Sequence, residues 1–282
     1  MDTYKCKICN NNLEKIIMTF DTPDAMEVAA NVKKENYQRN YYCCDYCGVY
    51  QSDLAYNSID NDIYSKNYYE HVDHETIEGK FNRVMSMTEN QSDNWKRINR
   101  VLKTVNKYRE NLKLCQGSSL LDVGAGTGVF IGKLKTIDQS WTTSALEPDA
   151  HACNHLRKVL NTEVVEDVLR PRVIKQRYDL ITLNRVLEHI PEVSQVMNLV
   201  TSFLKPGGIV YVELPDIITL HHNGKEDDAF ASAHLTIFDI KTLVILFEKS
   251  CLFPLEISRV KDPSGKYTVY GFASYLDKRV NN

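Results

Sequence analysis

One ten-residue stretch limits the possible folds of this chain more than any other part of it. Residues 119–128 read Ser-Leu-Leu-Asp-Val-Gly-Ala-Gly-Thr-Gly, so an apolar segment runs directly into three alternating glycines. Glycine adopts positive φ angles easily and leaves room where a side chain would keep a ligand from the backbone. A buried strand followed by such a turn and a helix presents backbone N–H groups to a phosphate or nucleotide ligand. The stretch therefore predicts a ligand site at the end of a buried strand.

Apolar strands and amphipathic helices alternate after this turn. The alternation predicts an α/β fold, namely a Rossmann-like, seven-stranded, mostly parallel sheet with helices on both faces. We expect ligands at the carboxyl ends of its strands. The expected strands are 120–123, 141–146, 163–165, 178–183, 209–214, 255–260 and 268–275, and the expected helices are 127–137, 149–160, 192–204 and 239–250.

Acidic and polar residues follow the later strands. Glu147 and Pro148 come after the second strand, with Glu147 19 residues beyond Gly128. A carboxylate at this place can accept both hydroxyls of a ribose, and Asp149 is suited to cap the next helix. Three further segments follow in order: Asp167-Val168 after the third strand, Asn184-Arg-Val-Leu-Glu-His-Ile-Pro191 after the fourth, and Leu204-Lys-Pro-Gly-Gly208 as a turn before the fifth.

Taken in order and spacing, these segments resemble the class I S-adenosylmethionine-dependent methyltransferases over residues 119–214. The resemblance implies that Glu147 receives the ribose and that Asp167 lies near the adenine amino group. It also implies that Asp122 holds the glycine turn or the amino group of the methionine moiety. The cofactor-binding residues implied in this part of the chain are Asp122, Gly124, Ala125, Gly126, Gly128, Glu147, Pro148, Asp167, Val168, Asn184 and Arg185.

Five of the eight cysteines lie in the first 47 residues. Four of them form two Cys-x-x-Cys pairs, Cys6-Lys-Ile-Cys9 and Cys44-Asp-Tyr-Cys47. Two such pairs complete a tetrahedral Zn²⁺ site without an open position, so we expect a structural zinc. Gly48 supplies the left-handed residue that often follows such a pair. Two alternatives remain open: Cys43 as a ligand in place of Cys44, and a disulfide or unrelated thiols in place of a metal site.

Further segments narrow the resemblance to nucleotide-sugar C-methyltransferases with an N-terminal zinc domain, and to relatives that act on small hydroxylated metabolites. Residues 44–51 and 63–69 resemble segments of these enzymes, which implies that Tyr69 helps to close over the cofactor. The segment His234-Leu-Thr-Ile-Phe238 also fits. Those enzymes carry a histidine base within a Tyr-x-Glu-His segment, but residues 231–234 here read Ala-Ser-Ala-His. The histidine is kept, whereas its tyrosine and glutamate companions are absent.

The candidate catalytic residues are two histidines and one glutamate. A sulfonium methyl group is already activated, so the protein mainly aligns the acceptor, and a base helps when the acceptor is a hydroxyl. His234 follows the fifth strand, and Glu188 and His189 follow the fourth. Each histidine could instead bind the cofactor or cap a helix. The polar loop with His221 and His222 is expected at the solvated surface.

The formal net charge of −3 disfavours a long nucleic acid as partner. The chain has no apolar run long enough for a membrane span and no signal-peptide core near Met1, so we expect a cytoplasmic protein. The expected domains are a zinc module (1–55), a linker and helical cap over the active site (56–114), and an S-adenosylmethionine-binding domain (115–282). Within the cap, residues 56–80 are expected as linker, and the helical pattern begins at Phe81.

The leading hypothesis is methylation of a small polar metabolite, above all a nucleotide-linked or glycan-bound sugar. Methylation of tRNA or protein, with the zinc module docking the macromolecule, is an alternative. A non-catalytic scaffold of the same fold is a third. The oligomeric state and the methylated atom do not follow from the sequence.

Overall fold

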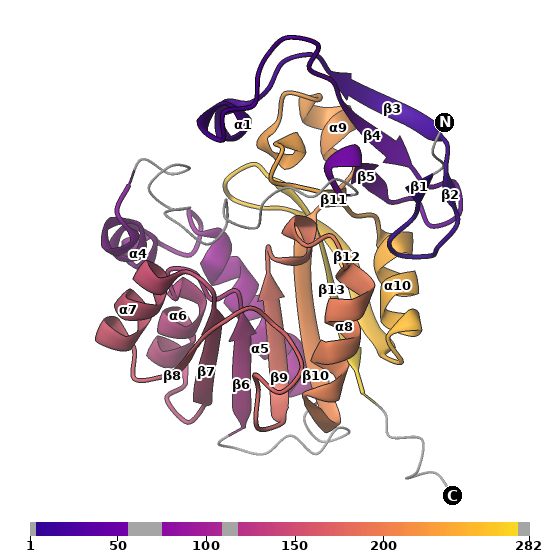
Figure 1. Cartoon of the computed structure of the whole chain (residues 1–282). Coiled ribbons are helices and arrows are strands. Elements are labelled where there is room, and N and C mark those ends of the chain that lie inside the picture. Colours follow the sequence, from indigo (N-terminus) through magenta and orange to yellow (C-terminus); the bar gives the residue numbers. More distant parts are fainter. Residues whose placement is uncertain (1–3, 56–74, 109–117, 276–282) are drawn as a thin grey trace, which may run out of the picture.

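The computed structural model describes residues 4–55, 75–108 and 118–275. A seven-stranded sheet in the order β12-β13-β10-β9-β6-β7-β8 organises them (Figure 1). The strands from β10 to β8 pair in parallel, whereas β13 is antiparallel to both β10 and β12. This confirms the predicted Rossmann-like sheet. Its strands are β6 (Ser119–Val123), β7 (Thr142–Glu147), β8 (Glu163–Glu166), β9 (Tyr178–Asn184), β10 (Leu204–Pro215), β12 (Phe253–Lys261) and β13 (Tyr267–Ser274).

The strand order reverses at β6, which lies between β7 on one side and β9 on the other. In open α/β sheets, ligands bind in the crevice that forms at such a reversal, beyond the carboxyl ends of the strands. The glycine turn at 124–128 follows β6 directly. The topology therefore puts the most informative part of the sequence at the place where a ligand site is expected.

Helices cover both faces of the sheet because successive strand residues point to opposite faces. Leu120 and Leu180 face one buried cluster, together with apolar residues of α5, α6 and α7. Leu121 and Ile181 face the other, which includes residues of α8 and α10. These helices are α5 (Asp93–Tyr108), α6 (Val129–Ile137), α7 (Ala150–Val159), α8 (Val193–Ser202) and α10 (Ile240–Lys249). As predicted, Asp149 caps α7, where its side chain accepts from the N–H of Ala152 at 2.8 Å.

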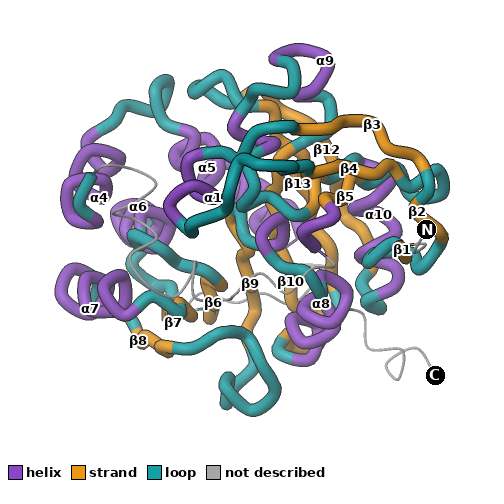
Figure 2. Tube along the Cα trace, turned by 45° about the horizontal axis from the view of Figure 1, so that its top comes forward, coloured by secondary structure: helices purple, strands orange, loops and turns teal. Residues whose placement is uncertain are grey.

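The N-terminal residues 4–55, called the N-terminal module below, lie beyond the carboxyl ends of the central strands (Figure 1). Seen with this end turned forward, α1 and its neighbouring loops lie in front of those strands (Figure 2). A four-stranded sheet in the order β11-β5-β4-β3 runs through the module, and its strand β11 comes from far down the chain. The elements are β1 (Tyr4–Lys5), β2 (Asn12–Leu13), β3 (Lys15–Phe20), α1 (Ala25–Ala29), β4 (Arg39–Cys43), β5 (Tyr50–Ser52), η1 (Asp53–Ala55) and β11 (Thr236–Ile237).

Buried side chains of the N-terminal module hold the backbone that leads into β11. The Tyr41 hydroxyl donates to the carbonyl of His234 at 2.5 Å, and Arg39 Nη1 donates to the carbonyl of Phe230 at 2.9 Å. The N–H of Ser232 donates to the Asp24 carboxylate at 2.6 Å. The module therefore fixes residues 230–237, and with them the backbone of a candidate catalytic histidine.

Two predicted helix starts were wrong. The helix expected from Phe81 begins earlier, as α4 (Ile77–Ser86), because the Thr76 hydroxyl caps it. The helix expected from Thr127 begins only at Val129, because the preceding glycine is left-handed and still belongs to the turn. Most of the expected linker, including the tyrosine-rich residues 56–74, lies outside the described residues.

The segment at 206–208 was expected as a turn before the fifth strand and instead lies within β10. The pairing of β10 with β9 shifts register between Leu204 and Ile209, so the strand accommodates the Pro-Gly-Gly sequence as an irregularity. Three short helices complete the described chain, η2 (Leu187–His189), α9 (Thr219–Asn223) and η3 (Asp228–Phe230). Within the described ranges, no helix has both the length and the apolar character that a bilayer crossing requires.

Candidate active site

The glycine turn requires glycine for both conformation and space. Gly124, Gly126 and Gly128 have φ angles of 67°, 55° and 78°, in the left-handed region. A Cβ on Gly124 would lie 2.7 Å from a methyl carbon of Val186, and one on Gly128 would lie 2.5 Å from a methyl carbon of Leu156. Side chains at these positions would both strain the turn and collide with the core.

Glu147, at the end of β7, is only 5% exposed, and both of its carboxylate oxygens accept backbone N–H groups. Oε2 accepts from Gly126 at 2.8 Å, and Oε1 accepts from Asp149 at 3.0 Å. Burial raises the pKa of Glu147, and these two N–H groups act against that rise. Each oxygen keeps a further lone pair, so the carboxylate that shapes the turn can also accept two hydroxyls.

Asp122, within β6, is buried and accepts from the Thr182 hydroxyl at 2.6 Å and from Asn184 Nδ2 at 2.9 Å. Burial raises the pKa of Asp122 to about 7, although these two hydrogen bonds oppose the rise. Oδ1 of Asn184 is buried and has no hydrogen-bond partner among the described residues. A ligand with hydrogen-bond donors at this place would satisfy both Oδ1 of Asn184 and the carboxylate of Asp122.

A single cavity of about 860 Å³ joins most of the predicted site residues. Gly128 does not line it, and Tyr69 lies outside the described residues. Asp167 is at a partly exposed part of its wall and forms an ion pair with Arg170 at 2.6 Å, beside the exposed Val168. The predicted residues that line the cavity are Asp122, Gly124, Ala125, Gly126, Glu147, Pro148, Asp167, Val168, Asn184, Arg185, Glu188, His189 and His234.

The rings of His189 and His234 lie beside each other in this cavity, with centroids 4.9 Å apart. Nδ1 of His189 is 2.8 Å from the carbonyl of Ala233, and Nδ1 of His234 is 3.0 Å from the carbonyl of Ala229. A carbonyl only accepts, so Nδ1 carries the proton in both rings. Burial lowers the pKa of His189 to about 4 and that of His234 to about 3. Both rings are therefore neutral at pH 7, with Nε2 as the basic nitrogen.

Glu188 lies next to this histidine pair and is completely buried. Neither carboxylate oxygen has a hydrogen-bond partner in the described part of the chain. Burial raises the pKa of Glu188 to about 7, and the charge of Arg185 opposes the rise. One Glu188 oxygen and one ring nitrogen from each histidine lie within 4.8 Å of one another. The three candidate catalytic residues thus form one cluster in the cavity wall.

Arg185 takes the unusual φ of 60° for a residue other than glycine, directly after β9. Its guanidinium donates to the hydroxyl of Thr268 and lies 3.7 Å from the Glu213 carboxylate. Backbone strain of this kind, about 1–3 kcal/mol, persists where the surroundings fix the residue, and it concentrates at functional sites.

A buried ionic network surrounds Glu213 in β10, and sequence reasoning missed it. Arg97 of α5 donates two hydrogen bonds to the carboxylate, one of them at 2.9 Å, and Arg100 donates a third at 3.1 Å. Burial alone would raise the pKa of Glu213, but the arginines hold it well below the usual range. No local motif marks these partners, because more than 100 residues separate them. Other cavity residues not predicted from the sequence include Met26, Lys80, Asp228, Lys266 and Tyr267.

The cysteines Cys6, Cys9, Cys44 and Cys47 are buried and their sulfurs all lie within 4.8 Å of one another; they form the cysteine cluster. The sulfur distances are 3.5 Å for Cys6–Cys47 and 3.4 Å for Cys9–Cys44. A disulfide would require about 2.05 Å, whereas Zn–S bonds of about 2.3 Å place tetrahedral ligands about 3.8 Å apart. The geometry fits a metal site and leaves Cys43 outside it.

Each cysteine pair ends in a left-handed residue, as expected for Gly48, whose φ is 81°. Its counterpart Asn10, with a φ of 67°, was not predicted from the sequence. The N–H of Gly48 donates to the carbonyl of Cys44, and the N–H of Asn10 donates to the carbonyl of Cys6, both at 2.8 Å. The two turns are thus equivalent, and the hydrogen bond with Cys47 lowers the pKa of the Cys6 thiol.

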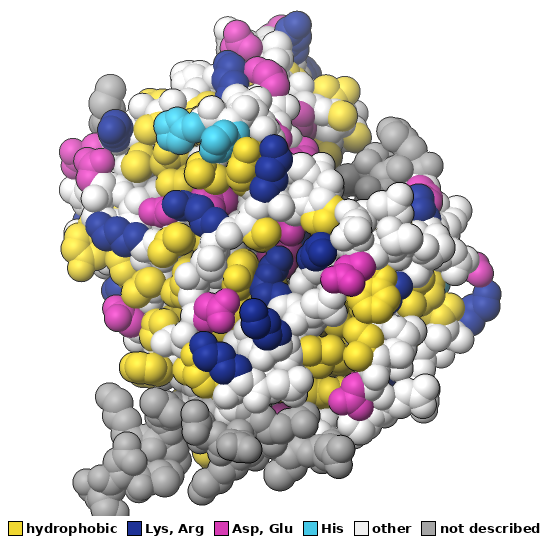
Figure 3. All heavy atoms as spheres, turned by 180° about the vertical axis from the view of Figure 1, so that it is seen from behind, with side chains coloured by type: hydrophobic (Ala, Val, Ile, Leu, Met, Phe, Trp, Pro, Cys, Tyr) yellow, Lys and Arg dark blue, Asp and Glu magenta, His cyan; other side chains and the backbone are white. Residues whose placement is uncertain are grey.

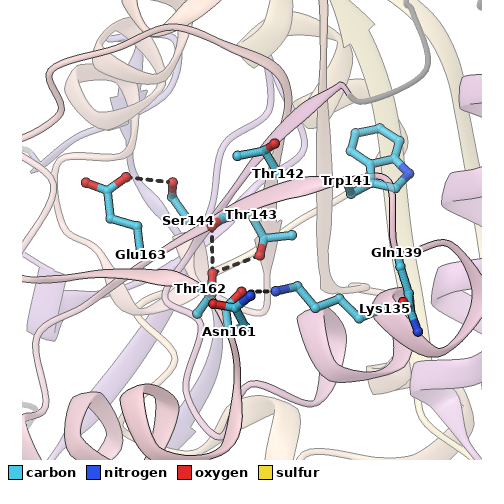
Figure 4. A pocket seen from close by; sticks show the side chains of 9 residues that line it. All are labelled: Lys135, Gln139, Trp141, Thr142, Thr143, Ser144, Asn161, Thr162 and Glu163. Carbon is cyan, nitrogen blue, oxygen red and sulfur yellow. Dashed lines mark hydrogen bonds between the residues drawn. The ribbon is translucent and has the colours of Figure 1, made fainter.

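A second cavity of about 560 Å³ lies at the amino ends of β7 and β8 (Figure 4). Three of its hydroxyl groups already have partners: Thr143 and Thr162 share a hydrogen bond of 2.8 Å, and Ser144 donates to Glu163 at 3.1 Å. None of the predicted site residues line it. The cavity at the carboxyl ends is therefore the candidate active site.

The chain is similar in sequence to known methyltransferases. The chain is 30% identical over 160 residues to the ubiquinone biosynthesis O-methyltransferase of Salmonella arizonae, covering 55% of this chain and 64% of that protein. It is 22% identical over 190 residues to the C-methyltransferase NovU of Streptomyces niveus, covering 65% of this chain and 44% of that protein. The chain thus spans less than two thirds of the length of these relatives.

Among solved structures, magnesium protoporphyrin IX methyltransferase from Synechocystis, with bound S-adenosylhomocysteine, has the same fold. The TM-score is 0.54 at 10% sequence identity, and the match covers 76% of this chain and 96% of that one. At family level, residues 94–250 match the model of the methyltransferase domain, which is more than half of the chain. The chain therefore belongs to the methyltransferase domain family.

Proposed function

We propose that this protein transfers a methyl group from S-adenosylmethionine to a small polar acceptor. One observation carries the proposal: a single cavity contains both the glycine turn with Glu147 and the cluster of Glu188, His189 and His234. The first set can bind a nucleoside, and the second offers basic groups for an acceptor. The family match supports methyl transfer as the reaction.

The residues at the glycine turn fit the cofactor. The free lone pairs of Glu147 can receive the two ribose hydroxyls. Oδ1 of Asn184, which has no hydrogen-bond partner in the described part of the chain, lies beside Asp122 and suits the ammonium of the methionine moiety. We assign the adenine to Asp167 and Val168, because both line the partly exposed wall of the cavity. When bound, the cofactor supplies a methyl group that its positively charged sulfur has already activated.

The protein's own task is then to hold the acceptor and remove its proton. The neutral rings of His189 and His234 and the buried Glu188 are the groups in the cavity wall suited to this step. Aligning the acceptor oxygen behind the methyl carbon accounts for a large part of such a rate enhancement. The choice of His234 as the base, made from the sequence, stays a prediction.

The acceptor we propose is a small hydroxylated molecule, and more specifically a nucleotide-linked sugar. A cavity of about 860 Å³ has room for a cofactor and a metabolite but not for a folded macromolecule. Lys266 at its wall can meet a phosphate, since its pairing with Asp228 is about half exposed. On the face in Figure 3, acidic and basic side chains of the described residues are interspersed, which does not favour a long nucleic acid. The relative NovU is a C-methyltransferase, and the Salmonella relative is an O-methyltransferase.

We further propose that the cysteine cluster binds a structural Zn²⁺. Four buried cysteines with tetrahedral spacing support it. The ion would stabilise the N-terminal module, whose Tyr41 holds the backbone at His234. The division into a module (1–55), a cap (56–114) and a cofactor-binding domain (115–282), and a role for Tyr69 in the cap, stay predictions.

The test is a methyl-transfer assay with the full chain. S-adenosylhomocysteine formation is followed with nucleotide sugars, small phenols and diols, bulk tRNA, and protein as acceptors. We expect turnover with a hydroxylated small molecule, and much less of it in Glu147→Gln when S-adenosylmethionine is below saturation. Turnover with tRNA or protein alone would contradict the acceptor class, and cofactor binding without turnover on any acceptor would indicate a scaffold.

A further inference from the structure

We propose that Glu188, His189 and His234 form a second metal site, which binds a divalent transition-metal ion in the wall of the main cavity. The proposal starts from the donor set. Two imidazole nitrogens and one carboxylate oxygen lie within 4.8 Å of one another. Metal bonds of about 2.0–2.2 Å need ligand atoms about 3–3.5 Å apart. Closing the cluster around an ion therefore takes side-chain movements of about 1 Å.

The orientation of both histidines suits ligation. Histidine ligands usually donate their other ring N–H to a carbonyl or carboxylate, which fixes the ring and its tautomer. Here Nδ1 of His189 donates to the carbonyl of Ala233, and Nδ1 of His234 donates to the carbonyl of Ala229. The lone pair for a metal is thereby assigned to Nε2 in each ring. The supporting carbonyls come from the segment that the N-terminal module holds in place.

The electrostatics of Glu188 also point to a cation. A buried carboxylate without hydrogen bonds is costly unless an opposite charge compensates it. Glu188 is 0% exposed, and its two oxygens lack hydrogen-bond partners among the described residues. The positive charge of Arg185 acts on it, but that guanidinium binds Thr268 and also lies near Glu213 and Asp262. An ion bound between the three ligands would compensate Glu188 directly.

The ligand types select the class of ion. Imidazole nitrogen favours zinc, iron, cobalt and similar ions, whereas all-oxygen sites favour magnesium and calcium. Two imidazoles and one carboxylate thus suit a first-row transition metal. Three protein ligands leave coordination positions open, in contrast to the cysteine cluster, whose four thiolates close the tetrahedron. The cluster is therefore able to bind an exchangeable oxygen ligand.

The role of the ion rests on the proposed function, in which the ion then takes the place of a histidine base: with Nε2 of both histidines bound to the metal, neither ring accepts the proton. An acceptor hydroxyl that binds at an open position becomes more acidic. Its proton passes to water, and the oxygen forms a bond to the methyl carbon while the bond from carbon to sulfur breaks. S-adenosylhomocysteine and the methylated oxygen are the products. An acceptor with two adjacent oxygens would gain most, because both can bind the ion.

Titration of the full chain with Co²⁺ alone tests the site, because Co²⁺ reports its ligands in its absorption spectrum. Binding at the cysteine cluster gives intense thiolate-to-metal charge-transfer bands. Binding at the proposed site gives visible ligand-field bands without a sulfur contribution. The variants are Glu188→Gln and His234→Gln, and the matched control is His151→Gln, which changes an exposed histidine on α7.

We expect wild type and His151→Gln to show the sulfur-free bands. Both site variants should bind Co²⁺ at that site at least about tenfold more weakly. The thiolate bands, or retained zinc, verify that each variant is folded. Absence of sulfur-free bands in the wild type, or equal affinity in all four proteins, would overturn the proposal. The titration uses neither cofactor nor acceptor, so its outcome is independent of the methyl-transfer assay. Failure of the metal-site proposal can therefore be told apart from failure of the proposed function.

Discussion

Replacing Glu147 with glutamine tests whether this carboxylate organises the cofactor site or merely lies near it. The two Glu147 oxygens accept the N–H groups of Gly126 and Asp149 at 2.8 and 3.0 Å. Glutamine has only one oxygen, so its NH₂ group must face one of these two donors. One backbone N–H therefore loses its acceptor, and one ribose hydroxyl loses a charged acceptor.

The size of the effect follows from these two losses. A buried donor without a partner costs about 1–3 kcal/mol, which lowers the free energy of unfolding of the cofactor-free variant. A hydrogen bond to a charged group contributes about 1.5–3 kcal/mol to binding. Because about 1.4 kcal/mol is a factor of ten in affinity, S-adenosylmethionine should bind Glu147→Gln roughly 10- to 150-fold more weakly.

Equilibrium dialysis with radiolabelled S-adenosylmethionine measures this affinity. Glu166→Gln is the matched control, since Glu166 ends the neighbouring strand β8 and pairs with Arg157 at the surface. The control should bind the cofactor like the wild type. A dissociation constant for Glu147→Gln within about threefold of the wild type would refute the assignment of Glu147 to the ribose.

Three further outcomes test other parts of the structure. Cys44→Ser should lose bound zinc by elemental analysis, whereas Cys43→Ser should keep it; equal zinc contents would exclude the proposed ligand set. Glu213→Gln removes the charged partner of the buried Arg97 and one of the two carboxylates near Arg100, and should lower the free energy of unfolding in urea by about 3–5 kcal/mol; a loss below about 1 kcal/mol would contradict this reading. Burial raises the pKa of Asp122 from 3.8 to about 7, so the unfolded chain binds fewer protons between these values. As the pH rises through this range, the free energy of unfolding of the wild type should therefore fall by about 1.4 kcal/mol per pH unit relative to that of Asp122→Asn. Urea unfolding at several pH values measures both proteins, and parallel pH profiles would argue against the raised pKa.

The sequence was most informative where the signal is local. The strand and turn at 119–128 depend on residue alternation and on glycine, and both were predicted. Asp149 as a helix cap and Gly48 as a left-handed residue follow from the chemistry of single side chains. The same holds for the two cysteine pairs, because spacing alone brings the thiols of each pair together.

Most of the missed features depend on partners far apart in the chain. Tyr41 reaches the carbonyl of His234 across 193 positions, and Arg97 reaches Glu213 across 116. Strand β11 pairs with β5 for only two residues, too few to leave a periodic pattern. Even Glu147 was assigned only a ligand role, because its bonds to Gly126 and Asp149 depend on how the turn folds back onto β7. Tertiary packing decides these contacts, and apart from Glu147 and Asp149 no short window of sequence contains both partners.

The central claim is that the cavity at the glycine turn binds the methyl donor. Titration calorimetry of the full chain with S-adenosylhomocysteine tests it most directly, because the demethylated product occupies the same site without turnover. We predict saturable binding of one molecule per chain, weakened in Glu147→Gln and unchanged in Glu166→Gln. The absence of saturable heat at any practical concentration, with a folded protein, would contradict the account.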